Sequence, residues 1–262
     1  MKRFIVTLGL ASAASFNPMV LSQAFAQVAP YGQSGSAYVL TFFDEFNGTQ
    51  LDSRKWNTHF FYDPPDNTPN YAVEGGYLKM WPERLADGSF PKRTIDTDSG
   101  KFSQRYGYFE MEAKLPYGRG PWPAFWLWNH SGSTFPEIDI MEAYPGGGPA
   151  SEWSDANLHA NTYGTTIWLD STTRAGFKMV HPEPPQDLST TFHKYAVKWE
   201  ANRIIFYFDG KEVYRKNARI NVPMYVLLDL WYGSASNPPD STTPTGKTNA
   251  FEINYVRVWR SR

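Results

Sequence analysis

The sequence contains no cysteine among its 262 residues. A disulfide framework and a lipid-modified N-terminal cysteine are therefore both excluded. The fold must be stabilised by its hydrophobic core, and a chain of this length can bury one as a single domain.

The sequence also has no excess of positive charge, with 25 Lys and Arg against 26 Asp and Glu. Proteins that bind nucleic acids normally present a basic surface, because each phosphate of the ligand carries a negative charge. The charge balance therefore argues against a nucleic-acid partner.

Long apolar runs are absent except at the start of the chain, where "MKR" precedes "FIVTLGLASAASF" and "AFA" follows. A positive start, a short apolar run and a small-residue cleavage site are typical of a secretory signal peptide. Asn17 and Pro18 interrupt the run before it reaches the roughly 20 residues that span a bilayer. We predict a signal peptide over residues 1–26, a secreted (extracellular or periplasmic) mature chain over 27–262, and no membrane contact after cleavage.

Convincing helical periodicity is absent too, whereas aromatic residues are abundant, with 10 Trp, 16 Tyr and 18 Phe. Short segments such as "YGYFEMEAKLP", "AFWLWN" and "MYVLLDLWYG" are rich in strand-forming residues and end at turn residues. Many short strands predict an all-β sandwich or barrel. Trp and Tyr rings can fill a core, but they also stack on the apolar faces of sugars.

Successive side chains of a strand point to opposite faces, and in three predicted strands one of the two faces collects polar or aromatic residues. These faces comprise Trp122, Ala124, Trp126 and Trp128; Asn157, His159, Asn161 and Tyr163; and Asp229 with Trp231. The opposite faces are apolar, which predicts two packed sheets, one of them exposing an aromatic and polar surface. Ordinary core packing of the tryptophan row is the alternative.

The segment "EIDIME", residues 137–142, conflicts with this alternation. On a flat strand Glu137 and Asp139 share one face and Glu142 lies on the other. One extra residue inserted as a β-bulge would return Glu142 to the first face, and bulges are frequent beside active sites. Two clustered carboxyl groups are what a retaining glycosidase needs. An outward-facing Glu142 on a plain strand and a calcium-binding acidic cluster are the alternatives.

With the preceding "GPWPAFWLW" and the later "NLHANTYG", "FHKYAVKWEANRIIFYFDGKEV" and "NYVRVW", this motif resembles glycoside hydrolase family 16, in its branch with a bulged E-x-D-x-x-E motif. The resemblance covers nearly all of residues 27–262. It implies a jelly-roll β-sandwich of two antiparallel sheets, similar to concanavalin A, with the catalytic cleft across one sheet.

The resemblance also implies roles for the three acids. Glu137 would be the nucleophile, Glu142 the general acid/base, and Asp139 the residue that separates their pKa values. Trp122, Trp126, His159 and Trp231 match positions that line the cleft in relatives. With Asn157, Asn161 and Asp229, they are the predicted substrate-binding residues.

Three positions depart from the family pattern. Asp229 stands where members often have Asn, and Glu112 stands where they often have Arg. Many members bind a structural calcium through an Asp near the last strand, where this sequence has Asn254. We therefore predict no cofactor and no metal ligand.

The resemblance implies hydrolysis of β-1,3-glucan or mixed-linkage β-1,3-1,4-glucan, but the branch also includes enzymes that act on agars, carrageenans and porphyrans. The predicted cleft residues lack the cluster of Arg and Lys that a sulfated polymer would need, which favours neutral glucans. We expect a monomer whose partner is a polysaccharide. A galactan, a bacterial exopolysaccharide, transglycosylation and a non-catalytic sugar-binding module remain open.

Overall fold

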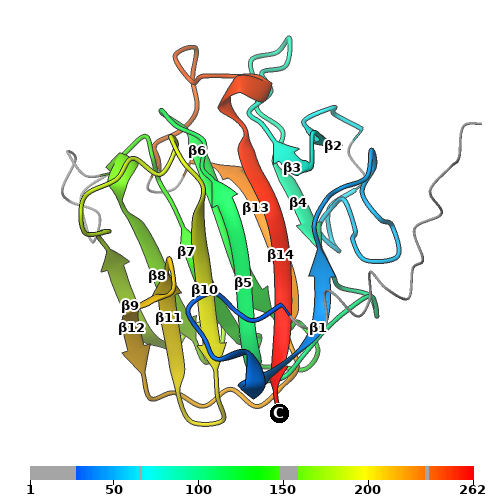
Figure 1. Ribbon diagram of the computed structural model, residues 1–262. Coiled ribbons are helices and arrows are strands. Elements are labelled where there is room, and N and C mark those ends of the chain that lie inside the picture. Colours follow the sequence, from blue (N-terminus) through cyan, green and yellow to red (C-terminus); the bar gives the residue numbers. More distant parts are fainter. Residues whose placement is uncertain (1–27, 65–66, 148–158, 234–235) are drawn as a thin grey trace, which may run out of the picture.

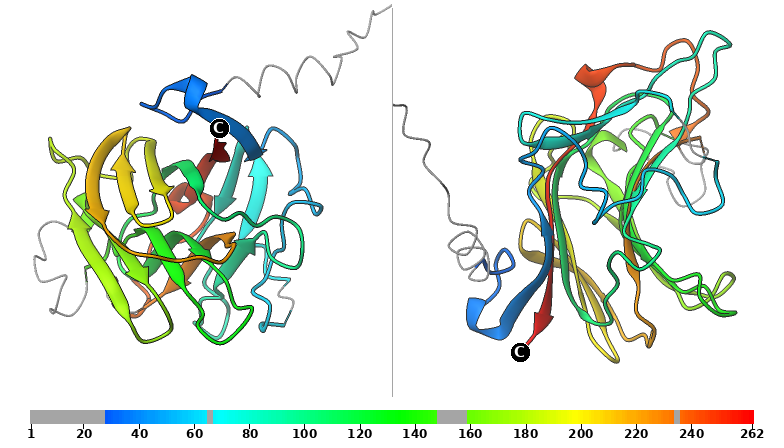
Figure 2. Two further views of the ribbon diagram at one scale, coloured as in Figure 1. Left: turned by 90° about the horizontal axis from the view of Figure 1, so that it is seen from below. Right: turned by 90° about the vertical axis from the view of Figure 1, so that its right-hand side faces the viewer.

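The computed structural model describes residues 28–64, 67–147, 159–233 and 236–262. Two antiparallel β-sheets pack face to face, as the edge-on view in Figure 2 shows. The three short 3-10 turns among the described elements are η1 (Gly35–Ala37), η2 (His159–Asn161) and η4 (Lys247–Asn249). The predicted all-β jelly-roll sandwich is confirmed.

The larger sheet has eight strands. Seven of them run in the order β12-β11-β10-β5-β14-β3-β2, and β1 also pairs with β14. Their bounds are β1 (Tyr38–Asp44), β2 (Tyr71–Glu74), β3 (Tyr77–Met80), β5 (Gly107–Lys114), β10 (His193–Trp199), β11 (Ile204–Phe208), β12 (Lys211–Lys216) and β14 (Phe251–Ser261).

The smaller sheet has six strands in the order β4-β13-β6-β7-β8-β9 (Figure 1). Their bounds are β4 (Arg93–Asp96), β6 (Pro121–Trp128), β7 (Glu137–Glu142), β8 (Tyr163–Trp168), β9 (Arg174–Val180) and β13 (Tyr225–Tyr232). Since β6 and β7 lie in the middle of this sheet, their side chains occupy the centre of each of its faces.

The core lies between the sheets and uses alternate residues of each strand. Phe125 and Leu127 of β6, with Val226 and Leu228 of β13, are fully buried in it. Because side chains alternate along a strand, the residues between them point to the outer face of the smaller sheet. The alternation predicted for these two strands is therefore confirmed.

The strand predicted through residues 157–163 is wrong in part. His159–Asn161 form the turn η2, and β8 begins only at Tyr163. Tyr163 is buried in the core, where its ring packs against Tyr195 at 5.2 Å and Phe208 at 5.8 Å. Alternation holds only within a continuous strand, so the turn breaks the predicted face.

The predicted signal peptide, residues 1–26, lies outside the described residues. Within the part of the chain that the structure describes, no helix has both the length and the apolar character needed to cross a bilayer.

Candidate active site

The predicted bulge is present in β7. Along β6, Phe125 and Trp126 are consecutive, but their partners in β7 are Met141 and Asp139, which leaves Ile140 as the extra residue. The register with β8 shifts at the same place. Ile140 and Met141 are both buried in the core, so two successive side chains point inward.

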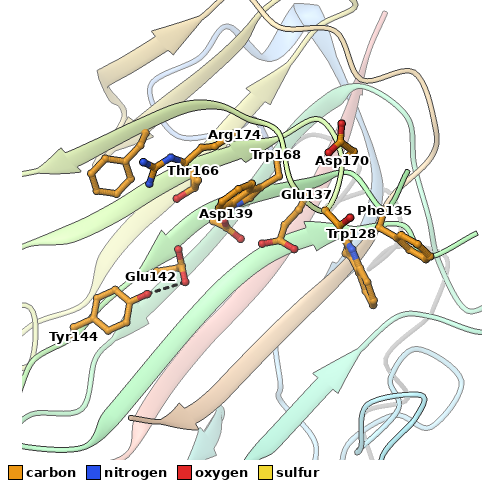
Figure 3. A pocket seen from close by; sticks show the side chains of 12 residues that line it. Trp128, Phe135, Glu137, Asp139, Glu142, Tyr144, Thr166, Trp168, Asp170 and Arg174 are labelled. Atoms are coloured by element: carbon orange, nitrogen blue, oxygen red, sulfur yellow. Dashed lines mark hydrogen bonds between the residues drawn. The ribbon is translucent and has the colours of Figure 1, made fainter. Parts of the chain in front are cut away.

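The bulge returns Glu142 to the outer face of the sheet. Glu137, Asp139 and Glu142 therefore line one cleft, and Figure 3 shows them in a row along β7. Asp139 is 3% exposed, whereas the two glutamates are partly open to the cleft.

The cleft extends to both sides of these acids. One side, which we call the polar arm, has a volume of about 620 Å³. It is lined by Trp128, Phe135, Tyr144, Thr166, Trp168, Asp170, Ser171, Arg174 and Phe177 together with the three acids. The other side, the aromatic arm, has a volume of about 260 Å³. Its further lining residues are Phe60, Tyr62, Trp122, Ala124, Trp126, Trp128, Asp229 and Trp231.

The first two acids of β7 are linked by a hydrogen bond. Burial raises the pKa of Asp139 well above its usual range, and the charges of Glu137 and Glu142 raise it further. The protonated form of Asp139 is therefore favoured, and in that form Asp139 donates the hydrogen bond to Glu137. Burial raises the pKa of Glu137 to about 7, although the hydrogen bond from Asp139 opposes this rise.

Glu142 has its own set of donors. Trp122 Nε1 lies 3.1 Å and the Tyr144 hydroxyl 3.0 Å from Glu142 Oε1, and both donate to it. Burial raises the pKa of Glu142, and the hydrogen bonds from Tyr144, Trp122 and Thr166 act against this rise. Because Trp122 and Tyr144 both donate to Oε1, we assign the proton of the acid form to Oε2.

The three predicted tryptophans all line the aromatic arm, as expected. Trp122 and Trp231 are partly exposed and meet edge to face at 5.8 Å. Trp126 is only 9% exposed, and its Nε1 donates to Asp229 Oδ2 at 3.0 Å. Trp126 therefore forms the floor of the arm more than a free stacking surface.

Asp229 is a buried acid below the aromatic arm. It is 3% exposed, and burial raises its pKa to about 8 despite hydrogen bonds from Thr94 and Trp126. Its Oδ1 has no hydrogen-bond partner among the described residues. An ionised carboxylate there would carry an incompletely compensated charge, which explains why the neutral form is favoured.

Of the remaining predicted cleft residues, only Asn161 has a described side chain. Asn157 lies outside the described residues, and of His159 the structure describes only the backbone, in η2. Asn161 ends that turn and does not line either arm in the described part of the chain. Because His159–Asn161 form a turn, the predicted alternation does not continue to Tyr163 of β8.

Several lining residues were missed by the sequence analysis. Thr166 and Trp168 alternate with the core residue Ile167 along β8, so the pattern in "YGTTIW" could have revealed them. Arg174 and Phe177 belong to β9, whose sequence "RAGFKMV" carries no clear alternation. Phe60 and Tyr62 lie on a loop, and no local pattern predicts where a loop passes.

No group of three or more His, Cys, Asp or Glu is arranged to hold a metal ion among the residues that the structure describes. The described part of the site offers carboxyl groups to a ligand. It contains one buried acid with a raised pKa and two partly open glutamates on one face, at the junction of two arms.

A jelly-roll sandwich with clustered acids in a cleft across one sheet defines a structural class that includes sugar-cleaving enzymes. The sequence model described as "Glycosyl hydrolases family 16" matches residues 79–257, which is more than half of the chain. The chain therefore belongs to glycosyl hydrolases family 16.

The chain is 29% identical over 220 residues to the endo-1,3-1,4-beta-glycanase EglC of Rhizobium meliloti (strain 1021), covering 80% of this chain and 44% of EglC. It is 29% identical over 269 residues to the glucan endo-1,3-beta-glucosidase A1 of Niallia circulans, covering 84% and 37%. This chain thus spans less than half the length of either relative.

The solved structure is that of SCLam, a non-specific endo-beta-1,3(4)-glucanase from family GH16. It superposes with a TM-score of 0.70 at 25% identity and covers 87% of this chain and 92% of the SCLam chain.

Proposed function

We propose that this protein is a secreted, endo-acting, retaining glycoside hydrolase that cleaves β-1,3-glucan or mixed-linkage β-1,3-1,4-glucan. The observation that carries the proposal is the bulge at Ile140, which brings Glu137 and Glu142 to one face beside a protonated Asp139. The glucan preference is supported by the names of the relatives and of the solved structure.

In the first step, the Glu137 carboxylate attacks the anomeric carbon and forms an ester bond to it, while the glycosidic C–O bond breaks. The leaving oxygen takes the proton from Glu142 Oε2. In the second step, the Glu142 carboxylate removes a proton from water, and the water oxygen attacks the same carbon. This attack breaks the ester and returns Glu137 as a carboxylate, with two inversions giving net retention.

The proton held by Asp139 matters in both steps. Its hydrogen bond to Glu137 stabilises the carboxylate form of the nucleophile and makes Glu137 a better leaving group when the ester is cleaved. An ionised Asp139 would place a further negative charge beside the Glu137 carboxylate, which the burial of Asp139 disfavours.

Endo cleavage is supported by the shape of the cleft. The acids are shared by the polar and aromatic arms, so a sugar chain can extend past the cleaved bond on both sides. Trp122 and Trp231 offer aromatic surfaces in one arm and Trp168 offers another in the second, as stacking on sugar rings requires.

Hydrolysis of an anionic polysaccharide is a second candidate, favoured by one observation. In each arm one aromatic ring has a cation over it: Lys92 Nζ lies 4.7 Å from the centre of Trp231, and the Arg174 guanidinium lies 5.8 Å from that of Trp168. A carboxylate or sulfate on the substrate could pair with such cations.

A reducing-sugar assay tests the proposal across laminarin, lichenan, agarose, carrageenan, xyloglucan and an acidic bacterial exopolysaccharide. Release from laminarin or lichenan alone supports the proposal, and release only from a charged polymer supports the second candidate. NMR of the first product gives its anomeric configuration, and an inverted product would contradict the retaining mechanism. Product sizes at high acceptor concentration separate hydrolysis from transglycosylation.

A further inference from the structure

An aromatic patch formed by Phe61 and Tyr62 lies at the edge of the cleft. Phe61 is 49% and Tyr62 59% exposed, on the loop that connects β1 to β2. Their ring centres are 4.9 Å apart, and that of Phe61 lies 6.0 Å from the Trp128 ring, which lines both arms. The patch is therefore continuous with the cleft, because Tyr62 also lines the aromatic arm.

The Phe61 ring is held in one orientation from behind. It stacks on His130 with ring centres 4.1 Å apart and an interplanar angle of 4°. His130 Nε2 lies 2.8 Å from Asp98 Oδ2, which fixes the imidazole. The ring is thus a flat surface formed before any ligand arrives, and binding it costs little conformational entropy.

The loop that carries the patch is anchored as well. The Asp63 amide donates to the Phe60 carbonyl at 2.9 Å, and the Lys92 ammonium lies 2.9 Å from Asp63 Oδ2. The Phe60 ring stacks on Trp128 at 5.3 Å. The apolar ring of Phe61 therefore stays exposed on a loop tied to the wall of the cleft.

We propose that Phe61, with Tyr62 beside it and His130 behind it, is an outer binding site for a sugar residue of the same polysaccharide that occupies the cleft. The apolar C–H face of a pyranose ring matches an exposed aromatic face. Continuity with the cleft selects this occupant, because a chain that leaves the aromatic arm passes Tyr62. The inference rests on the proposed function, since it needs a polysaccharide in the cleft.

The test compares a long soluble glucan with the shortest oligosaccharide that the enzyme cleaves. For Phe61→Ala, we expect KM on the long glucan to rise roughly 3- to 10-fold with kcat unchanged, as the loss of one aromatic contact implies. On the short oligosaccharide, both constants should match those of the wild type. Tyr31→Ala is the control, because Tyr31 is also 49% exposed but its amide binds Glu110 in the other sheet.

A KM that is unchanged on both substrates, or raised equally on both, would overturn the outer site. So would a dimer of the wild type that Phe61→Ala converts to a monomer in light scattering, because the patch would then be an interface between two copies. If Phe61→Ala lowers the melting temperature strongly, Phe61→Leu replaces it, since leucine keeps an apolar contact but has no flat ring.

A binding measurement separates this inference from the proposed function. Glu137→Gln protein, with and without Phe61→Ala, is run in native gels that contain laminarin or lichenan. Retardation that Phe61→Ala reduces supports the outer site, even if the wild type hydrolyses neither polymer. Equal retardation of the two proteins contradicts the outer site, even if hydrolysis is established.

Discussion

Asp139 and Asp229 lie in the same sheet and are both only 3% exposed, but the groups that surround the two carboxyl groups differ. Asp139 faces other carboxyl groups and shares a hydrogen bond with Glu137, so in the proposed mechanism its proton acts on the nucleophile. Asp229 faces indole and hydroxyl donors from Trp126 and Thr94, so its carboxyl group holds the floor of the aromatic arm. We therefore assign Asp139 to the proposed chemistry and Asp229 to the support of the aromatic arm.

The proposed nucleophile can be tested by removing its side chain. Glu137→Ala leaves no group to form the glycosyl-enzyme ester, so we expect turnover to fall to background. Added azide should attack from the vacated side and restore turnover, giving a glycosyl azide of inverted configuration. NMR of the azide product measures this.

Removal of the proposed acid/base is expected to give a sugar azide of the opposite configuration to that from Glu137→Ala. Glu142→Ala should lower the rate on a natural polymer by roughly 10² to 10⁴, and far less on a substrate whose leaving group needs no proton. Azide should then attack the intact ester, and the sugar azide should retain its configuration. Retention from Glu137→Ala together with inversion from Glu142→Ala would show that the two roles are reversed.

At the scale of the element, the tryptophans of the aromatic arm divide into two kinds. Trp122→Ala and Trp231→Ala should weaken oligosaccharide binding roughly 2- to 10-fold with a small loss of stability, because both rings are partly exposed. Trp126→Ala should instead cost about 3 to 5 kcal/mol of unfolding free energy, since it leaves a cavity and removes a donor to Asp229. Calorimetric titration with an oligosaccharide measures the loss of binding, and urea unfolding measures the loss of stability. An unchanged unfolding midpoint in Trp126→Ala would contradict this division.

Much of the site could be predicted where strands are regular and central. The faces of β6 and β13 follow from simple alternation, since each strand is paired on both sides and one face must fill the core. The bulge in β7 was predicted from a conflict, because three acids in "EIDIME" cannot share one face of a flat strand.

The residues that the sequence analysis placed wrongly or missed also have a physical explanation. The turn at His159–Asn161 interrupts the chain before β8, and alternation counted across it assigned Tyr163 to the wrong face. Phe60, Phe61 and Tyr62 are brought to the cleft by contacts with Trp128 and His130, which are distant in sequence. Such contacts leave no periodic trace in the loop itself.

At the scale of the whole molecule, the sandwich buries acids whose pKa values are raised by burial. Burial raises the pKa of Asp229 from 3.8 to about 8 and that of Glu137 from 4.5 to about 7. Between about pH 4 and pH 8, the folded state therefore binds more protons than the unfolded chain, and stability falls as the pH rises.

The opposite case is Asp170, whose pKa is lowered to about 2 by hydrogen bonds from the Thr172 amide and hydroxyl. The contribution of Asp170 to the stability of the folded state is lost only as the pH falls below about 4.

We therefore expect the melting temperature to fall between about pH 5 and pH 8, and the fall to be shallower in Asp229→Asn. The asparagine carbonyl can still accept from Trp126 Nε1, but the side chain has no proton to lose in this range. Asp170→Asn is the matched control, because its carboxylate is already ionised throughout the same range and its slope should equal that of the wild type. Thermal unfolding followed by circular dichroism measures the slopes. Equal slopes for the wild type and Asp229→Asn would mean that Asp229 is ionised in the folded protein, and that an ionised carboxylate is tolerated beneath the aromatic arm.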